Sequence, residues 1–150
     1  MKRFFALVLL CVSILVIGSV LGCTTPITDL VSRSYNLING TITVSPGRYY
    51  SVSFPVDMNA MHNVWVDGSF TAAGGLGDDI EVYIMDDIAY TNWVNGHTVS
   101  VIYSSGKVTT ANIGVAITMS GNYHLVFSNR FSIVSSKNVA TKVDLKWSEL

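Results

Sequence analysis

The sequence is poor in cysteine, and both of its cysteines lie near the N-terminus. Cys11 falls inside an apolar run, and Cys23 directly follows that run. A disulfide needs two cysteines in the folded domain, and a thiolate metal site needs several. Removal of residues 1–22 leaves only Cys23, so we expect neither kind of site. The folded domain therefore has to rely on a packed core.

Charge is also scarce, with 9 Lys and Arg against 10 Asp and Glu and a formal net charge of -1. The sequence has no basic cluster of the kind that nucleic-acid binding requires. It also lacks the Gly-x-Ser-x-Gly, His-Glu-x-x-His and Cys-x-x-Cys spacings of common catalytic and metal sites. We therefore expect a protein without catalytic activity and without a nucleic-acid partner.

One long hydrophobic run is present, at the N-terminus. Two basic residues precede an apolar stretch over residues 4–21, and Gly22 then stands directly before Cys23. A basic start, an apolar middle and a small residue at the cut are typical of export signals. The step from a small residue to cysteine resembles the lipobox of prokaryotic lipoproteins. The resemblance implies a signal peptide over residues 1–22, acylation of Cys23 with chains such as palmitate, and attachment to a membrane.

An uncleaved membrane helix is the alternative interpretation of the same run, which approaches the roughly 20 apolar residues that span a bilayer. Both interpretations place the rest of the chain outside the cytoplasmic membrane, in the cell envelope. We favour cleavage because Gly22 and Cys23 coincide with the end of the run. We expect residues 23–35 to form a tether and residues 36–150 to form a soluble domain.

After the tether, apolar and polar residues alternate in one short run after another. The pattern is clear in Val64 and Val66, and in Ile80, Val82 and Ile84. Alternation with period two indicates strands with one face in the core. We expect eight strands, over residues 37–44, 48–57, 62–73, 79–86, 97–104, 108–118, 122–128 and 138–147.

Turn-forming residues separate these runs at a spacing typical of sandwiches, and Asn95-Gly96 has the composition of a tight hairpin. The fold class that we predict is all-β, an antiparallel β-sandwich. Apolar residues also stand at three outward positions, Met85, Val126 and Ala140. They predict that part of the outer face is covered.

The C-terminal part of the sequence resembles the closing half of a GOLD domain, the β-sandwich of p24-type proteins. The resemblance is carried by the Gly121-Asn122-Tyr123 turn, by an apolar strand ending at Asn129, and by Ser135-Ser136-Lys137 before the last strand. The aspartate-bearing strand 79–86 is also similar to one in bacterial pre-peptidase C-terminal domains. The resemblance implies a GOLD-like or jelly-roll-like sandwich. Because the p24 cysteine pair is missing, it does not imply a cargo-receptor role.

Three acidic residues follow a glycine-rich turn and form a candidate calcium site. Asp78, Asp79 and Glu81 offer the oxygen ligands that a hard cation needs. The alternative is that the aspartates cap the turn and keep the loop hydrated. Apart from this possible Ca²⁺, we expect no cofactor.

Two aromatic residues, Tyr90 and Trp93, lie in a segment that we expect to join two strands. Exposed flat rings suit contact with sugars or peptides, so this segment is a candidate ligand site. Alternatively, Trp93 folds back and closes the end of the core. We expect His62, His97 and His124 to be ordinary surface residues, with His124 pointing outward.

These observations predict a lipid-anchored binding or accessory protein at the cell surface, whose partner is an envelope protein or a glycan. A calcium- or glycan-binding extracellular module is the alternative. A small secreted hydrolase is the second alternative, and it has no visible nucleophile–base pair in its favour.

Overall fold

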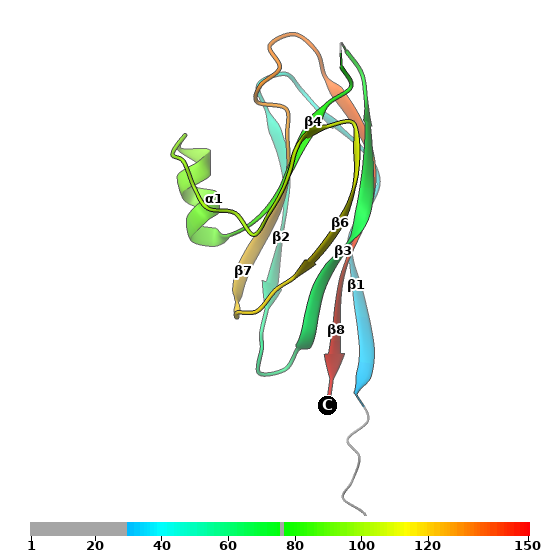
Figure 1. The fold of residues 1–150 in the computed structure, drawn as a ribbon, viewed down its shortest axis with the longest axis vertical. Coiled ribbons are helices and arrows are strands. Elements are labelled where there is room, and N and C mark those ends of the chain that lie inside the picture. The colour runs from blue at the N-terminus through cyan, green and yellow to red at the C-terminus, as the bar shows by residue number, and fades with distance from the viewer. Residues whose placement is uncertain (1–29, 76) are drawn as a thin grey trace, which may run out of the picture.

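The computed structural model describes residues 30–75 and 77–150, which form two antiparallel four-stranded sheets packed face to face (Figure 1). The all-β sandwich that the alternating sequence predicts is therefore confirmed. The predicted signal peptide, residues 1–22, and the predicted lipidation site, Cys23, lie outside the described residues.

The two sheets contain eight strands, and one helix packs outside them. The strands are β1 (Val31–Val44), β2 (Tyr49–Val56), β3 (His62–Ala73), β4 (Ile80–Asp86), β5 (Tyr103–Val108), β6 (Thr110–Ala116), β7 (Gly121–Ser128) and β8 (Lys137–Glu149). One sheet has the order β1-β8-β3-β6 and the other the order β2-β7-β4-β5. The helix is α1 (Asp87–Val94).

The core lies between the two sheets and is built from the inward half of each alternating run. Val66, Ile80 and Leu125 are among its fully buried residues. Aromatic rings fill its width, and Phe70 meets Phe127 edge to face at 6.2 Å between ring centroids. Because the sequence provides no cysteine pair for a disulfide in this domain, burial of this apolar surface is its main source of stability.

β1 begins at Val31, earlier than the predicted start at residue 37, so part of the predicted 23–35 tether belongs to the sandwich. Its first residues pair with the end of β8, where Val31 lies opposite Glu149. The residues of this stretch are exposed on both faces, so no hydrophobic alternation marks it. Polar contacts hold it instead, including a 2.9 Å ion pair between Arg33 Nε and Glu149 Oε2.

The segment after β4 is a helix, where we had predicted a loop followed by a strand at residues 97–104. Asp86 caps its N-terminus, with Oδ1 accepting a 2.7 Å hydrogen bond from the backbone N–H of Ala89. Asn95 caps its C-terminus, and Gly96 follows with φ of 84°. The Asn95-Gly96 pair therefore ends a helix instead of forming a hairpin.

β5 is displaced accordingly and contains Ser105 and Gly106, which we had predicted to lie between the strands 97–104 and 108–118. The pairing of β5 with β4 is irregular between Glu81 and Tyr83. There the Ser105 hydroxyl accepts a 2.8 Å hydrogen bond from the Val82 N–H. A side chain thus replaces a missing ladder partner, and turn-forming residues are accommodated in a bulged strand.

α1 lies against the outer face of the β2-β7-β4-β5 sheet, where it contacts β4 and β7 (Figure 1). Met85 and Val126 point to this face and are fully buried. The prediction of a covered outer face is confirmed at these two positions. It is wrong at Ala140, which is exposed.

The sandwich has two distinct ends. β1 begins and β8 finishes at one end, while the β1–β2 turn and the β7–β8 loop lie at the other (Figure 1). In the part of the chain that the structure describes, no helix has the length and apolar character to cross a membrane.

Candidate binding site

An aromatic cluster lies between α1 and the outer face of the sheet. We use this name for Tyr49, Tyr83, Tyr90, Trp93 and His124. The Trp93 ring lies 5.1 Å from the Tyr49 ring and 5.9 Å from the Tyr83 ring, centroid to centroid. Trp93 thus packs on the outside of the sheet and takes no part in the core, contrary to the alternative that it closes the core's end.

His124 connects the helix to β7, an inner strand of this sheet. Its ring stacks on Tyr90 with centroids 3.8 Å apart and planes 7° from parallel. Its Nε2 lies 2.7 Å from Oδ1 of Asp87, in the first turn of α1. His124 points outward from the sheet as predicted. It is not the ordinary surface residue that we expected, because its side chain is only 12% exposed and packs against Tyr90 of α1.

Three hydroxyl groups meet at the edge of the aromatic cluster. The Tyr90 hydroxyl lies 3.2 Å from Ser51 Oγ and 3.5 Å from the Tyr49 hydroxyl. The hydrogen bond with Tyr90, together with burial, raises the pKa of Tyr49. Its phenol is therefore neutral at physiological pH and can donate or accept a hydrogen bond.

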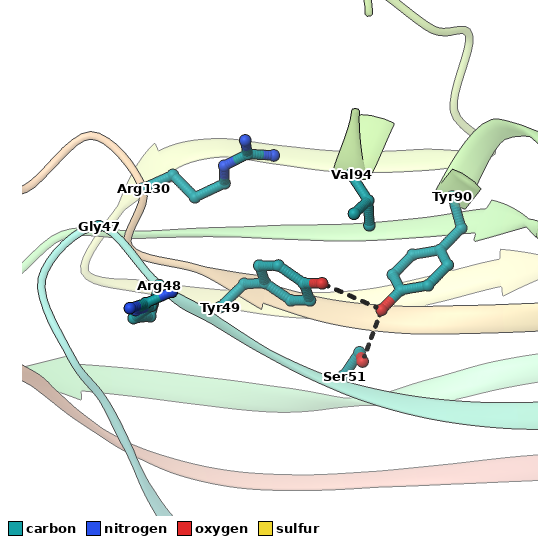
Figure 2. Close-up of a pocket in the computed structure, with 7 residues that line it drawn as sticks. All are labelled: Gly47, Arg48, Tyr49, Ser51, Tyr90, Val94 and Arg130. Atoms are coloured by element: carbon teal, nitrogen blue, oxygen red, sulfur yellow. Dashed lines mark hydrogen bonds between the residues drawn. The ribbon is translucent and has the colours of Figure 1, made fainter. Parts of the chain in front are cut away.

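A pocket of about 530 Å³ opens beside these hydroxyls. Its polar lining consists of Arg48, Tyr49, Ser51, Tyr90 and Arg130. Figure 2 shows Tyr90 reaching from α1 to Tyr49 and Ser51, with the two arginines beyond Tyr49. The volume lies within the range of small-molecule sites, roughly 300–1,000 Å³.

The two arginines give the pocket a positive charge. Arg130 Nη1 donates a 2.9 Å hydrogen bond to the carbonyl oxygen of Trp93, and its Cζ lies 4.8 Å from the Trp93 ring centroid. The Trp93 carbonyl also accepts a 3.1 Å hydrogen bond from the Gly96 N–H, so the bond from Arg130 is its second, and the Trp93 ring attracts the cation. Within residues 30–75 and 77–150, neither Arg48 nor Arg130 forms an ion pair with a carboxylate.

The three candidate calcium ligands are not brought together. Asp78 Oδ1 accepts a 2.7 Å hydrogen bond from the Gly74 N–H and so caps the turn. Glu81 lies next to Tyr83. Burial is the main cause that raises the pKa of Tyr83 to about 12, and the Glu81 carboxylate raises it further. Among the described residues, no three His, Cys, Asp or Glu side chains group in a way that could hold a metal ion.

The strand register also places Ser53 directly opposite His124, whose ring contacts Asp87. A serine, a histidine and an aspartate are therefore neighbours on the outer face. In the described part of the chain, the side-chain hydrogen bond of His124 goes to Asp87 and none goes to a serine. The serine–histidine hydrogen bond that activates a nucleophile is thus missing from this arrangement.

Sequence reasoning found Tyr90, which lines the pocket, and Trp93, which packs against Tyr49 beside it, but it missed the other lining residues. Tyr49 and Ser51 alternate with the inward residues of β2, so the sequence pattern could have placed both on the outer face of the sheet. Arg130 had no such signal, because it follows β7 in a loop and meets α1 only in the folded structure. The other two histidines do not line the pocket. His62 stands at the start of β3, and His97 lines a neighbouring cavity that also contains Glu81 and Arg130.

Comparisons with known proteins leave the GOLD-like and lipoprotein resemblances as predictions from the residues that carry them. No family model matches the chain, and no curated protein is significantly similar to it.

Proposed function

We propose that this protein is a lipid-anchored binding protein on the outside of the cytoplasmic membrane, and that it holds its ligand in the pocket beside α1. The observation that carries the proposal is the pocket itself. It combines two arginines, which form no ion pair among the described residues, with three clustered hydroxyls. A concave site with a few converging polar groups is typical of ligand binding.

The position of the tether supports display of this pocket. An acylated Cys23 would be followed by residues 24–30 before β1, a span of at most about 25 Å in extended form. The lipid would therefore hold the β1 end of the sandwich close to the membrane. Gly47 and Arg130, which line the pocket, belong to the loops at the opposite end (Figure 1).

The polar groups of the pocket favour binding over catalysis. Guanidinium groups and neutral phenols donate hydrogen bonds, and none of the residues lining the pocket is a histidine or a carboxylate that would serve as a general base. We therefore propose a non-enzymatic role for this site.

The anchoring part of the proposal is tested by metabolic labelling with a fatty acid in a prokaryotic host. Labelled palmitate should enter the wild-type protein and should not enter Cys23→Ala. Cys11→Ala is the matched control, because it removes a thiol within the predicted signal peptide and should leave labelling unchanged. Equal labelling of wild type and Cys23→Ala would overturn the proposed anchor.

A further inference from the structure

We infer that the pocket beside α1 binds an acidic carbohydrate, a chain of pyranose rings that carries carboxylate groups. The inference rests on the proposed binding function and narrows its ligand to one chemical class.

The charge of the pocket is the first argument. Arg48 and Arg130 both line it, and no Asp or Glu does. The whole chain carries a formal net charge of -1, so this is a local concentration of positive charge on a slightly acidic protein. A guanidinium group can form two parallel hydrogen bonds with one carboxylate, which gives both attraction and orientation.

Arg130 is already held in position for such a contact. Its bond to the Trp93 carbonyl occupies one of the five N–H groups of its guanidinium, and the Trp93 ring contacts the cation. Less side-chain freedom therefore remains to be lost when a ligand binds. Arg48 is exposed and adds a second positive charge to the same pocket.

The hydroxyls are the second argument, because they favour a sugar over a simple inorganic anion as the ligand. The hydroxyls of Tyr49, Ser51 and Tyr90 lie side by side at the pocket wall. Each can donate and accept, which matches the donor and acceptor groups of a pyranose ring. A small inorganic anion would leave most of the approximately 530 Å³ pocket unfilled.

Isothermal titration calorimetry on the full-length protein in detergent micelles tests the inference with three probes. They are an oligogalacturonate, its methyl-esterified form and inorganic phosphate. The two oligosaccharides have the same rings but differ in charge. The acidic form should bind at least tenfold more tightly than the ester, and added salt should weaken its binding. Phosphate should not bind measurably.

Substitutions assign the binding to the pocket. Arg48→Gln and Arg130→Gln should each weaken oligogalacturonate binding at least tenfold. Arg33→Gln removes the same charge from β1, where Arg33 pairs with Glu149, and should leave binding unchanged. Arg48→Gln remains informative if the loss of Arg130 loosens α1, because Arg48 is exposed. Thermal unfolding of each variant verifies that the domain is folded.

Each contrary result identifies what fails. Equal binding of the acid and its ester would overturn the acidic ligand while leaving a sugar-binding function in place. Equal loss of binding in Arg33→Gln and the pocket variants would overturn the assignment of the ligand to this pocket. Binding of phosphate as tight as that of oligogalacturonate would reduce the pocket to an anion site and overturn the carbohydrate. If no probe binds, the inference is wrong, whereas the anchor is judged separately by labelling at Cys23.

Discussion

Asn129 is a fully buried polar residue that joins the two loops carrying the arginines of the pocket. Its Nδ2 donates to the carbonyl oxygens of Val44 at 3.0 Å and Ser135 at 2.8 Å. Its backbone N–H and C=O pair with Arg48 and Gly47. Its Oδ1 has no hydrogen-bond partner among the described residues. The side chain therefore stabilises the structure through its two donated bonds.

Replacing Asn129 should consequently destabilise the domain. Asn129→Ala leaves two carbonyls without their donor and should lower the free energy of unfolding by about 1–3 kcal/mol. Asn129→Asp keeps the shape but cannot donate when ionised, so it should cost at least as much. Urea denaturation measures both changes. If Asn129→Asp were as stable as wild type, the donated bonds would not matter.

Two glycines in the β1-β8-β3-β6 sheet form a matched pair at the residue scale. A Cβ on Gly68 would lie 2.2 Å from the Lys142 carbonyl oxygen and 2.7 Å from the Val143 Cα. A Cβ on Gly114 would meet nothing within 4 Å. β8 cannot shift away from Gly68 because it is paired with β1 on its other side.

Alanine substitution should therefore have opposite effects at these two positions. Gly68→Ala should destabilise the domain by at least about 1–3 kcal/mol, the cost of overpacking. Gly114→Ala should be neutral or stabilise it by up to about 1 kcal/mol, because glycine loses more backbone entropy on folding. Thermal unfolding of the two variants provides the comparison. Similar melting temperatures for both would contradict the close packing at Gly68.

At the scale of elements, α1 explains why the pocket was not predictable from the sequence. The helix has eight residues and none of them is fully buried, so it shows no marked apolar face. Its start was visible in Asp86 followed by the acidic Asp87, a common N-terminal signal. The more extensive strand alternation around it led us to a loop and a strand instead. The sheet wall of the pocket was accessible to sequence reasoning, whereas the helical wall was not.

The N-cap of α1 gives a prediction confined to this element. Asp86→Ala removes the acceptor for the Ala89 N–H and should cost about 1 kcal/mol of local stability. Hydrogen exchange of the α1 amides should accelerate, while exchange in β7 and β8 should not. Asp57→Ala is the matched control, since Asp57 accepts the Asn59 N–H in the turn between β2 and β3 and not in a helix. Unchanged exchange in α1 of Asp86→Ala would show that the cap is dispensable.

At the scale of the whole molecule, the sandwich was predictable because most strands bury one face. The start of β1 and the bulged β5 were not predictable, because neither shows a hydrophobic period. The start of β1 is held by polar pairing at Arg33, and the Ser105 hydroxyl in β5 accepts a hydrogen bond from the Val82 N–H. That the lipid holds the β1 end of the domain and the ligand binds at the opposite end stays a prediction, since Cys23 lies outside the described residues.

Tyrosine ionisation predicts how the stability of the whole domain depends on pH. Burial is the main cause that raises the pKa values of Tyr103 and Tyr123, and that raises the pKa of Tyr83 from 10.0 to about 12. The folded state therefore binds these protons more tightly than the unfolded state does. Their contribution is complete below pH 10 and is lost as the pH rises through the folded pKa values.

The free energy of unfolding should accordingly fall between about pH 10 and pH 12. Tyr83→Phe removes one titrating group and should make that fall shallower. Urea denaturation at a series of pH values, with tyrosinate absorbance as a second readout, measures both. An equally steep fall in Tyr83→Phe would show that Tyr83 does not contribute to it.

The central claim is that the pocket beside α1 is where this protein binds its ligand. Amide chemical-shift mapping of the full-length protein in micelles, with oligogalacturonate added stepwise, tests it most directly. The account predicts the largest shifts at Arg48, Tyr49, Ser51, Tyr90 and Arg130, saturating with a single affinity. Shifts confined to the β1 end of the sandwich, or unchanged signals at these five residues under saturating ligand, would contradict it.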